Sequence, residues 1–273
     1  MRRETKVVAA VRPANKEPKP AADVYILSYP KTGRTWLRAL VGKALCDHYG
    51  LPPQRVLETE TLTAMAGLPR ADFYHDGSAM IDALSWRELD ADKTAYRGKR
   101  VLLLGRDVRD TLVSAYFQAT RRVKAFDGPI GAFVRDDRLG VEKVLAFYRQ
   151  WHDARHVPDA FAFLRYEAMH ADPAAALRSV LAFIGVHDVP QTIIDTALAF
   201  GRFDNLRSAE SENRFGSPKL RTPSTTDPEA FKVRRGKVGG FRDYLDPDDV
   251  AFIDACEAAR GCAFTRPAVE ATA

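Results

Sequence analysis

The chain has 273 residues, of which 46% are hydrophobic and 28% are charged, a balance typical of one α/β domain with a well-buried core. The formal net charge of +5 suits a phosphorylated small-molecule ligand, whereas a nucleic-acid surface would need a denser basic stripe with interleaved aromatic residues. No hydrophobic run approaches the length of a membrane span, and the three cysteines form neither a disulfide framework nor a zinc pattern, so we expect a reduced, cytoplasmic compartment.

Residues 1–20 are basic and contain proline, and their apolar run at residues 7–11 is too short for the core of a signal peptide. We therefore expect a flexible, solvated tail over residues 1–20 and a single domain over residues 21–273. No internal repeat and no second domain are apparent in the sequence.

The first predicted elements are a strand, a tight turn and a helix. Residues 24–27 are apolar and β-prone, as a buried parallel strand requires, and Pro30 and Gly33 mark a turn. Apolar residues then recur at helical spacing from Thr35 onward. Backbone N–H groups at such a helix start point outward, and the helix dipole favours an anion, so this turn predicts a phosphate-binding loop.

The lysine of this turn is out of place for a nucleoside-triphosphatase loop. That pattern, G-x-x-x-x-G-K-[ST], has its lysine after the second glycine, whereas Lys31 precedes Gly33. A P-loop kinase that binds Mg-ATP, with Asp107 as its acidic residue, is therefore only a second hypothesis. A third is a non-catalytic nucleotide-binding protein.

Beyond the first helix, residues 51–71 indicate a loop with short helical pieces, followed by a short extended run that ends at His75. The Asp-Gly pair at residues 76–77 predicts a turn there. Loop positions beside the carboxyl edge of a parallel sheet are favoured places for catalytic residues, which makes His75 a candidate.

Residues 100–105 form the clearest strand and are nearly all apolar, which favours a central place in a parallel sheet. A helix follows this strand. An Arg at the end of a strand and a Ser one or two turns into the next helix can converge on one phosphate, as Arg106 and Ser114 would. An amphipathic helix is expected over residues 140–155.

The third predicted strand spans residues 161–166, and an Asp-Pro pair at residues 172–173 opens another helix. Further helices are expected over residues 190–200 and 246–261, with a long loop over residues 207–240 between them. The alternation of strands and helices predicts an α/β fold with a parallel, doubly wound sheet.

Several separate segments resemble, in order, the pattern of the sulfotransferases that use 3′-phosphoadenosine-5′-phosphosulfate (PAPS). The turn YPKTGRTW at residues 29–36 resembles the family's 5′-phosphosulfate loop. The others are similar to its 3′-phosphate segment, the element after a core strand, the adenine-contacting element and the closing loop, at residues 106–114, 166–173, 203–206 and 234–240. The resemblance implies a P-loop-like sulfotransferase fold, with helices on both sides of a central parallel sheet.

The resemblance also implies which residues hold the phosphates of the donor. Lys31 would contact the bridging oxygen and stabilise the leaving phosphate. Four residues of the turn would offer N–H and hydroxyl groups to the 5′-phosphate: Thr32, Gly33, Arg34 and Thr35. The 3′-phosphate would be held by Arg106, Ser114, Arg234, Arg235 and Gly236.

The remaining implied roles concern the adenine and the acceptor. Trp36 would stack on the adenine, with Phe203 on its other side, and Tyr166 would hydrogen-bond to it. His75 would act as general base toward the hydroxyl, or less readily the amine, of an acceptor. In-line sulfuryl transfer with a lysine at the leaving oxygen needs no metal, and we expect none.

The chain departs from the family's pattern at several positions. Arg34 stands where Thr or Ser is usual, Arg235 replaces Lys, and residues 240–241 replace Asp-Trp. The segment 74–76 lacks the lysine that often precedes the base of the animal cytosolic enzymes, and their dimer motif is not evident. These departures suggest a bacterial-type relative with its own acceptor pocket, and they leave the oligomeric state open.

The acceptor itself cannot be read from the sequence, so a small metabolite, a natural-product scaffold and a sugar all stay open. Residues 55–85, 118–140 and 207–232 are expected to line its pocket. Four cations there would favour an anionic acceptor or simply form a solvated helix end: Arg121, Arg122, Lys124 and Arg138.

Overall fold

The computed structural model describes residues 21–82 and 84–265. The tail expected over residues 1–20 lies outside the described residues. Within them, the sheet has four parallel strands in the order β2-β1-β3-β4: β1 (Val24–Ser28), β2 (Ala71–Tyr74), β3 (Arg100–Gly105) and β4 (Ala160–Arg165). The parallel α/β fold predicted from the sequence is confirmed. The short extended run before His75 is an edge strand of the same sheet.

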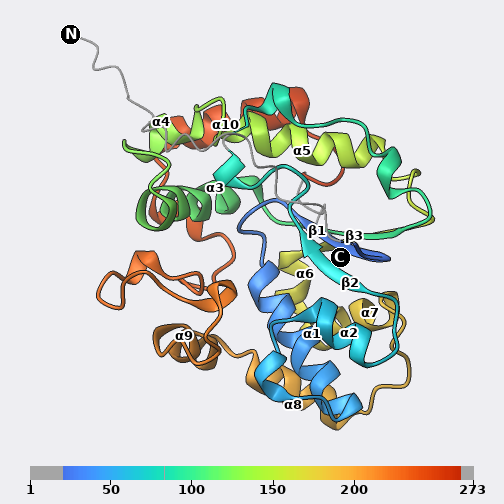
Figure 1. The fold of residues 1–273 in the computed structure, drawn as a ribbon. Helices are drawn as coiled ribbons and strands as arrows, with labels where there is room; N and C mark the ends of the chain where they lie inside the picture. Colours follow the sequence, from blue (N-terminus) through green and yellow to red (C-terminus); the bar gives the residue numbers. More distant parts are fainter. Residues whose placement is uncertain (1–20, 83, 266–273) are drawn as a thin grey trace, which may run out of the picture.

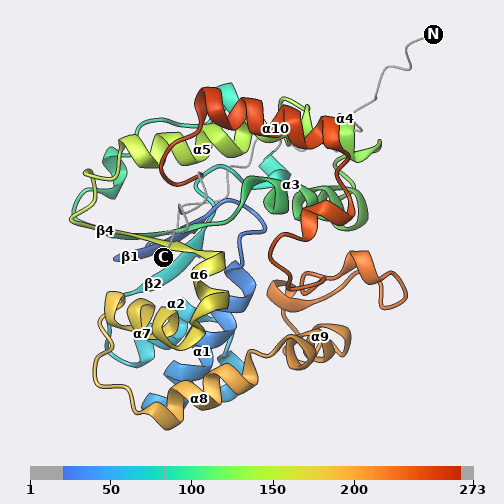
Figure 2. The same cartoon turned by 180° about the vertical axis from the view of Figure 1, so that it is seen from behind.

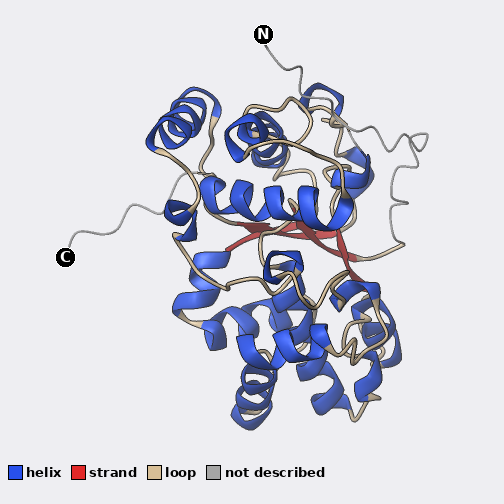
Figure 3. Cartoon of the chain, turned by 90° about the vertical axis from the view of Figure 1, so that its left-hand side faces the viewer, coloured by secondary structure: helices blue, strands red, loops and turns tan. Residues whose placement is uncertain are grey.

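Helices cover both faces of the sheet (Figures 1, 2 and 3). One layer consists of α3 (Val108–Phe117), α4 (Ile130–Val134), α5 (Val141–Asp153) and α10 (Pro247–Arg260). The other consists of α1 (Arg34–Tyr49), α2 (Thr59–Met65), α6 (Tyr166–Ala171), α7 (Pro173–Phe183) and α8 (Gln191–Phe200). None of the helices in the described ranges is long and apolar enough to cross a membrane.

The strands are apolar on both sides because each side faces a different core. Leu27 and Leu103 are fully buried among the residues beneath α3 and α5. Ile26 and Leu102, one position earlier on each strand, belong to the core beneath α1 and α7. Alternate residues of a strand point to opposite faces, so a sheet covered twice needs continuous hydrophobic runs.

The helix starts follow the predicted capping signals. Asp172 accepts a hydrogen bond from the backbone N–H of Ala175 at 2.9 Å, and α7 begins at the following proline. Asp246 caps α10 in the same way, through the N–H of Asp249 at 2.7 Å. These side chains satisfy donors that the helix itself leaves unpaired.

The predicted loop over residues 207–240 is wrong at its beginning, where the structure has a helix, α9 (Phe203–Ser211). Leu206, Ala209 and Glu210 of this helix are buried at helical spacing. The rest of the segment, as far as residue 239, is irregular apart from two short 3₁₀ turns, Pro218–Leu220 and Pro228–Ala230. This segment and α9 lie beside the two layers, at the side of the molecule where α1 and α3 begin (Figure 1).

Candidate active site

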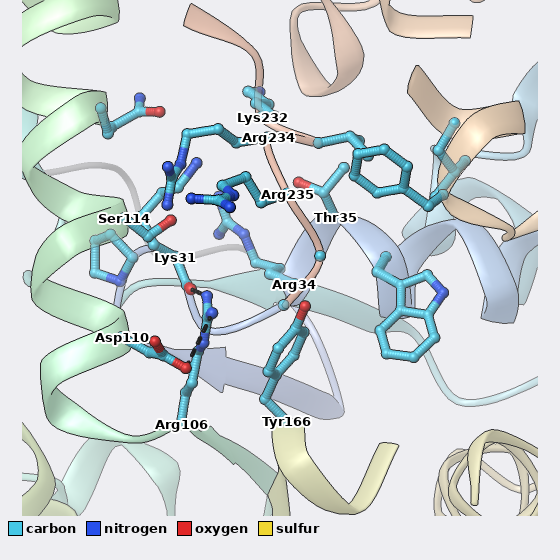
Figure 4. Close-up of a pocket in the computed structure, with 18 of the residues that line it drawn as sticks. Lys31, Arg34, Thr35, Arg106, Asp110, Ser114, Tyr166, Lys232, Arg234 and Arg235 are labelled. Atoms are coloured by element: carbon cyan, nitrogen blue, oxygen red, sulfur yellow. Dashed lines mark hydrogen bonds and ion pairs between the residues drawn. The ribbon is translucent and has the colours of Figure 1, made fainter. Parts of the chain in front are cut away.

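One cavity of about 830 Å³ contains nearly all of the predicted site residues (Figure 4). The strands β1, β2, β3 and β4 are parallel, so the residues that follow them emerge at one edge of the sheet: residue 29 onward, His75, Arg106 and Tyr166. The segment after α9 closes the cavity from the other side. The predicted residues that line it are Lys31, Gly33, Arg34, Thr35, Trp36, His75, Arg106, Ser114, Tyr166, Phe203, Arg234, Arg235 and Gly236.

The exception is Thr32, which does not line the cavity among the residues described. Its side chain is fully buried, and its hydroxyl donates a hydrogen bond to the Tyr29 carbonyl at 3.0 Å. The Thr32 hydroxyl therefore stabilises the turn from inside, and a contact of the Thr32 backbone N–H with the 5′-phosphate stays a prediction.

The turn before α1 has the backbone that an anion-binding loop needs. Gly33 has φ of 95°, and a Cβ there would lie 2.5 Å from Cδ2 of Tyr166. Only glycine combines that left-handed conformation with such a close approach. Lys31 also has a positive φ, of 76°, so the turn holds its lysine in an unusual backbone conformation beside the helix start.

Lys31 lies among other cations at the half-buried centre of the site. Burial and the positive charges of Arg122, Lys232 and Arg234 lower the pKa of its ammonium to about 7. Glu210 opposes this shift but does not cancel it. A lysine in such surroundings is fully charged only when an anion joins it.

Arg106 connects three parts of the site. Its guanidinium donates hydrogen bonds to the carbonyls of Lys31 at 3.2 Å and Lys237 at 3.1 Å, and it lies 4.3 Å above the Tyr166 ring. It also pairs with Asp110 across 3.5 Å (Figure 4). Asp107, the acid that a kinase would require, instead caps α3 and pairs with Arg109.

Asp110 fixes the glycine-rich segment that lies over the cavity, residues 234–241, here called the closing segment. Its carboxylate is only 2% exposed and accepts hydrogen bonds from the backbone N–H groups of Gly239 at 2.8 Å and Phe241 at 2.9 Å. The same carboxylate pairs with Arg106, so one buried acid links α3, the end of β3 and the closing segment.

Aromatic residues form the end of the cavity nearest α6. Trp36 lies 6.0 Å from Tyr166 and 4.9 Å from His170 between ring centroids. Phe203 is 39% exposed and stands against Gly236, where an added Cβ would lie 3.0 Å from its ring. The partly exposed rings of Trp36 and Phe203 therefore offer surfaces on which a flat base can stack.

His75 is held in one orientation by the backbone of β1. Its Nδ1 lies 2.8 Å from the Ser28 carbonyl, which can only accept, so Nδ1 carries the proton and Nε2 is left with a free lone pair. Burial, followed by the charge of Arg34, lowers its pKa well below the usual value. The ring is therefore neutral and able to accept a proton near neutral pH.

A buried network holds the segment that carries His75. Asp76 accepts hydrogen bonds from the Tyr96 hydroxyl at 2.6 Å and the Trp151 indole at 2.9 Å, and it pairs with the ammonium of Lys93 at 2.8 Å. Ser78 donates to the His75 carbonyl at 2.6 Å.

Residues 230–235 are shaped by a second buried acid. Glu210, fully buried on α9, accepts from the backbone N–H groups of Lys232 at 2.7 Å and Val233 at 2.9 Å. Arg122 lies 3.5 Å from the same carboxylate. Arg234 and Arg235 both donate to the Tyr244 hydroxyl, at 2.8 Å and 3.1 Å.

Asp110, Lys232 and His170 were not named as site residues in the prediction, although Lys232 lies in the segment 207–232 that was expected to line the acceptor pocket. Asp110 stands four residues after Arg106, and this spacing of opposite charges was a readable signal, although Arg106 itself precedes α3. Lys232 and His170 gave no such signal, because their positions depend on distant contacts: the backbone of Lys232 is held by Glu210 of α9, and His170 of α6 lies against Trp36 of α1. Among the described residues, no three His, Cys, Asp or Glu side chains group closely enough to hold a metal ion.

The fold and the cavity define an α/β protein with an anion-binding turn for a nucleotide. Residues 21–259 match the sulfotransferase domain, so the chain belongs to the sulfotransferase family. It is accordingly a sulfotransferase, as the resemblance implied.

The chain is similar to several curated sulfotransferases. It is 24% identical over 260 residues to cytosolic sulfotransferase 17 of Arabidopsis thaliana, with 85% of this chain and 72% of the relative covered. It is 22% identical over 267 residues to flavonol 3-sulfotransferase of Flaveria bidentis, with 85% and 79% covered.

Solved structures share the fold. Retinol dehydratase, in complex with androsterone and the inactive cofactor PAP, superposes with a TM-score of 0.62 at 15% identity, covering 92% of this chain and 84% of that one. Mouse sulfotransferase SULT7A1, complexed with PAP, gives 0.60 at 18% identity, covering 89% and 85%. At this identity the likeness concerns the fold alone.

Proposed function

We propose that this enzyme transfers the sulfuryl group of PAPS to a hydroxyl group of a small-molecule acceptor, with an amine as the less favoured acceptor. The observation that carries the proposal is the meeting of Lys31, a neutral His75 and Arg106 in one cavity beside the anion-binding turn. The PAP-bound structures of the relatives support the choice of donor.

The donor lies with its 5′-phosphosulfate on the turn and its adenine between Trp36 and Phe203. Backbone N–H groups at the start of α1 receive the 5′-phosphate, since they have no partner within the helix. Arg106, Ser114 and the closing segment receive the 3′-phosphate, for which arginine offers paired donors. Recognition of the 3′-phosphate would allow the enzyme to distinguish PAPS from ATP, which lacks that group.

The transfer is an in-line displacement at sulfur. The acceptor oxygen attacks, and its proton passes to Nε2 of His75. The bond between sulfur and the bridging oxygen breaks, and the electron pair stays on the 5′-phosphate of the leaving PAP. Lys31 offsets that charge, while the Ser28 carbonyl holds Nδ1–H and so stabilises the imidazolium.

The acceptor side of the cavity is formed by the three predicted segments. Residues 55–85 supply His75, Met80 and Ile81; residues 118–140 supply Gln118 and Val123; residues 207–232 supply Lys232. Small molecules fit such a cavity, whose volume lies in the upper part of the ~300–1,000 Å³ range of ligand sites. We place the reaction in the cytoplasm, as for the relatives named cytosolic.

The test is an acceptor screen with PAPS, read by mass spectrometry as the gain of one SO₃, together with calorimetry of PAP against Mg-ATP. We expect PAP to bind and Mg-ATP to bind far more weakly. His75→Ala should stop transfer and leave PAP binding intact, whereas Lys31→Ala should weaken both. His152→Ala, a half-buried histidine on α5 outside the cavity, is the matched control. Binding of PAP without sulfation of any acceptor would contradict the proposal.

A further inference from the structure

We propose that His170 recognises the adenine of the donor by accepting a hydrogen bond from the exocyclic amino group of the base. This inference rests on the proposed function and adds to it a residue that helps to determine which base the site takes. The resemblance to the family gave His170 no role, so the proposal rests on the position of its side chain in this structure.

His170 lies on the face of α6 that is turned toward the cavity. It stands four residues after Tyr166, and residues at this spacing share one face of a helix. Figure 4 shows Tyr166 extending from α6 into the cavity, and both residues line it. The centroids of the two rings are 4.6 Å apart, with their planes inclined by 69°. The helix therefore presents the imidazole and the phenol to the same space.

The imidazole also contacts the ring on which the adenine is proposed to stack. The centroids of His170 and Trp36 are 4.9 Å apart, and the ring planes are inclined by 49°. With 6.0 Å between Trp36 and Tyr166, the three rings form a close triangle. A base that stacks on Trp36 and is reached by Tyr166 lies next to His170 as well, because His170 contacts both of these residues.

The amino group of adenine needs a hydrogen-bond acceptor, since its nitrogen only donates. Of the residues on α6 to α9 that line the described part of the cavity, three have hydrogen-bonding side chains: Tyr166, His170 and Arg202. Arg202 cannot accept, and Tyr166 is the residue that the resemblance already assigns to the adenine. The others are apolar residues or glycine: Pro173, Leu198, Ala199, Gly201, Phe203 and Leu206. His170 is therefore the remaining side-chain acceptor on these elements.

The acceptor lone pair of His170 is available to a ligand. Partial burial, followed by the charge of Arg106, lowers the pKa of the imidazole, and Glu167 opposes this shift without cancelling it. The ring is therefore neutral near neutral pH, with one N–H and one nitrogen lone pair. Among the described residues, neither ring nitrogen has a hydrogen-bond partner, and the side chain is exposed.

A purely structural role would not use these nitrogens. A ring that served only to pack against Trp36 and Tyr166 needs no hydrogen-bonding atom, and phenylalanine would fill the same place. His170→Phe therefore separates the two roles, because it keeps an aromatic ring at this position and removes only the hydrogen bond.

The test is a double-mutant cycle in which one partner is on the protein and the other on the ligand. Calorimetry measures the Kd of PAP and of purine riboside 3′,5′-bisphosphate, which has a hydrogen atom in place of the amino group. We expect the wild-type enzyme to bind PAP about three- to tenfold more tightly than this analogue, as the loss of one hydrogen bond implies. In His170→Phe the difference should fall below about twofold.

Two further variants make the cycle specific. His170→Gln keeps a hydrogen-bond acceptor, the carbonyl oxygen of its amide, and should retain part of the preference for PAP. His152→Phe makes the same aromatic substitution at a half-buried histidine on α5 outside the cavity, and it should leave the preference unchanged.

Two results would overturn the inference. One is equal binding of the two bisphosphates by the wild-type enzyme. The other is a preference that persists in His170→Phe, including the case in which both ligands bind more weakly by the same factor, as a loss of packing alone would give. If the wild-type enzyme binds neither bisphosphate, the proposed function itself fails; if it binds PAP and either of these results is found, only the role of His170 fails.

Discussion

Replacement of Asp110 by asparagine should weaken nucleotide binding although Asp110 need not touch the nucleotide. The carboxylate accepts two backbone N–H groups of the closing segment, at 2.8 Å and 2.9 Å, while paired with Arg106. An asparagine amide can accept one of these N–H groups but presents its own NH₂ to the other. A hydrogen bond to a charged group contributes about 1.5–3 kcal/mol. If this stabilisation is lost only in the PAP-bound state, where the segment is closed, the Kd of PAP should rise by about 10- to 150-fold.

Calorimetry with PAP measures this change, and limited proteolysis of residues 232–241 reports whether the segment has loosened. Asp249→Asn is the matched control, because Asp249 is 4% exposed, is paired with Arg135 and does not line the cavity. The control should lower thermal stability without changing the Kd. A Kd for Asp110→Asn within about twofold of the wild-type value, with an unchanged proteolysis rate, would refute the reasoning.

Three further changes follow from the geometry. Gly33→Ala, which puts a methyl 2.5 Å from the Tyr166 ring at a φ of 95°, should abolish PAP binding in calorimetry, whereas Gly67→Ala, at a φ of 69° with open space around it, should only lower the melting temperature. Unliganded Lys31 has a pKa of about 7, and the bound anion should raise that pKa. PAP binding should therefore be accompanied by proton uptake near neutral pH and should weaken as the pH rises above 7. Calorimetry in buffers of different ionisation enthalpy measures the uptake, and buffer-independent binding enthalpies would contradict this prediction. Asp76→Ala should destabilise the fold by about 3–5 kcal/mol in urea unfolding, since it leaves its buried lysine partner unpaired.

The strands and most helices were predictable because their signals are local. The hydrophobic runs at residues 24–27 and 101–104 are continuous since both faces of the sheet are covered. The Asp-Pro pairs mark helix starts directly. The family pattern then assigned residues to one site, because parallel strands end at one edge. Among the predicted site residues, Thr32 alone does not line the described cavity, because its hydroxyl is buried inside the turn. The family pattern predicts where the backbone of Thr32 lies, but the direction of its hydroxyl depends on the nearest acceptor, here the Tyr29 carbonyl.

The remainder of the site was not predictable because it depends on contacts between distant segments. Lys232 is separated by 201 residues from Lys31, yet its charge acts on that lysine across the cavity. α9 looked like part of a loop, since its sequence is polar and its buried residues are few. The helix is stabilised by distant contacts: Leu206 and Ala209 are buried on one face, and Glu210 beside them accepts from the backbone of residues 232–233.

Two buried acids explain how a strongly cationic segment stays folded over a cationic site. Residues 232–237 contain four Lys or Arg side chains, which repel one another and Lys31. Asp110 and Glu210 hold this segment through its backbone N–H groups, at positions on either side of the arginines. The carboxylates of Asp110 and Glu210 accept hydrogen bonds mainly from backbone N–H groups. They therefore fix the segment without fully neutralising its Lys and Arg side chains. The positive field is thus available to a ligand. Burial first, and the neighbouring cations after it, lower the pKa values of the half-buried Lys31 and Lys232.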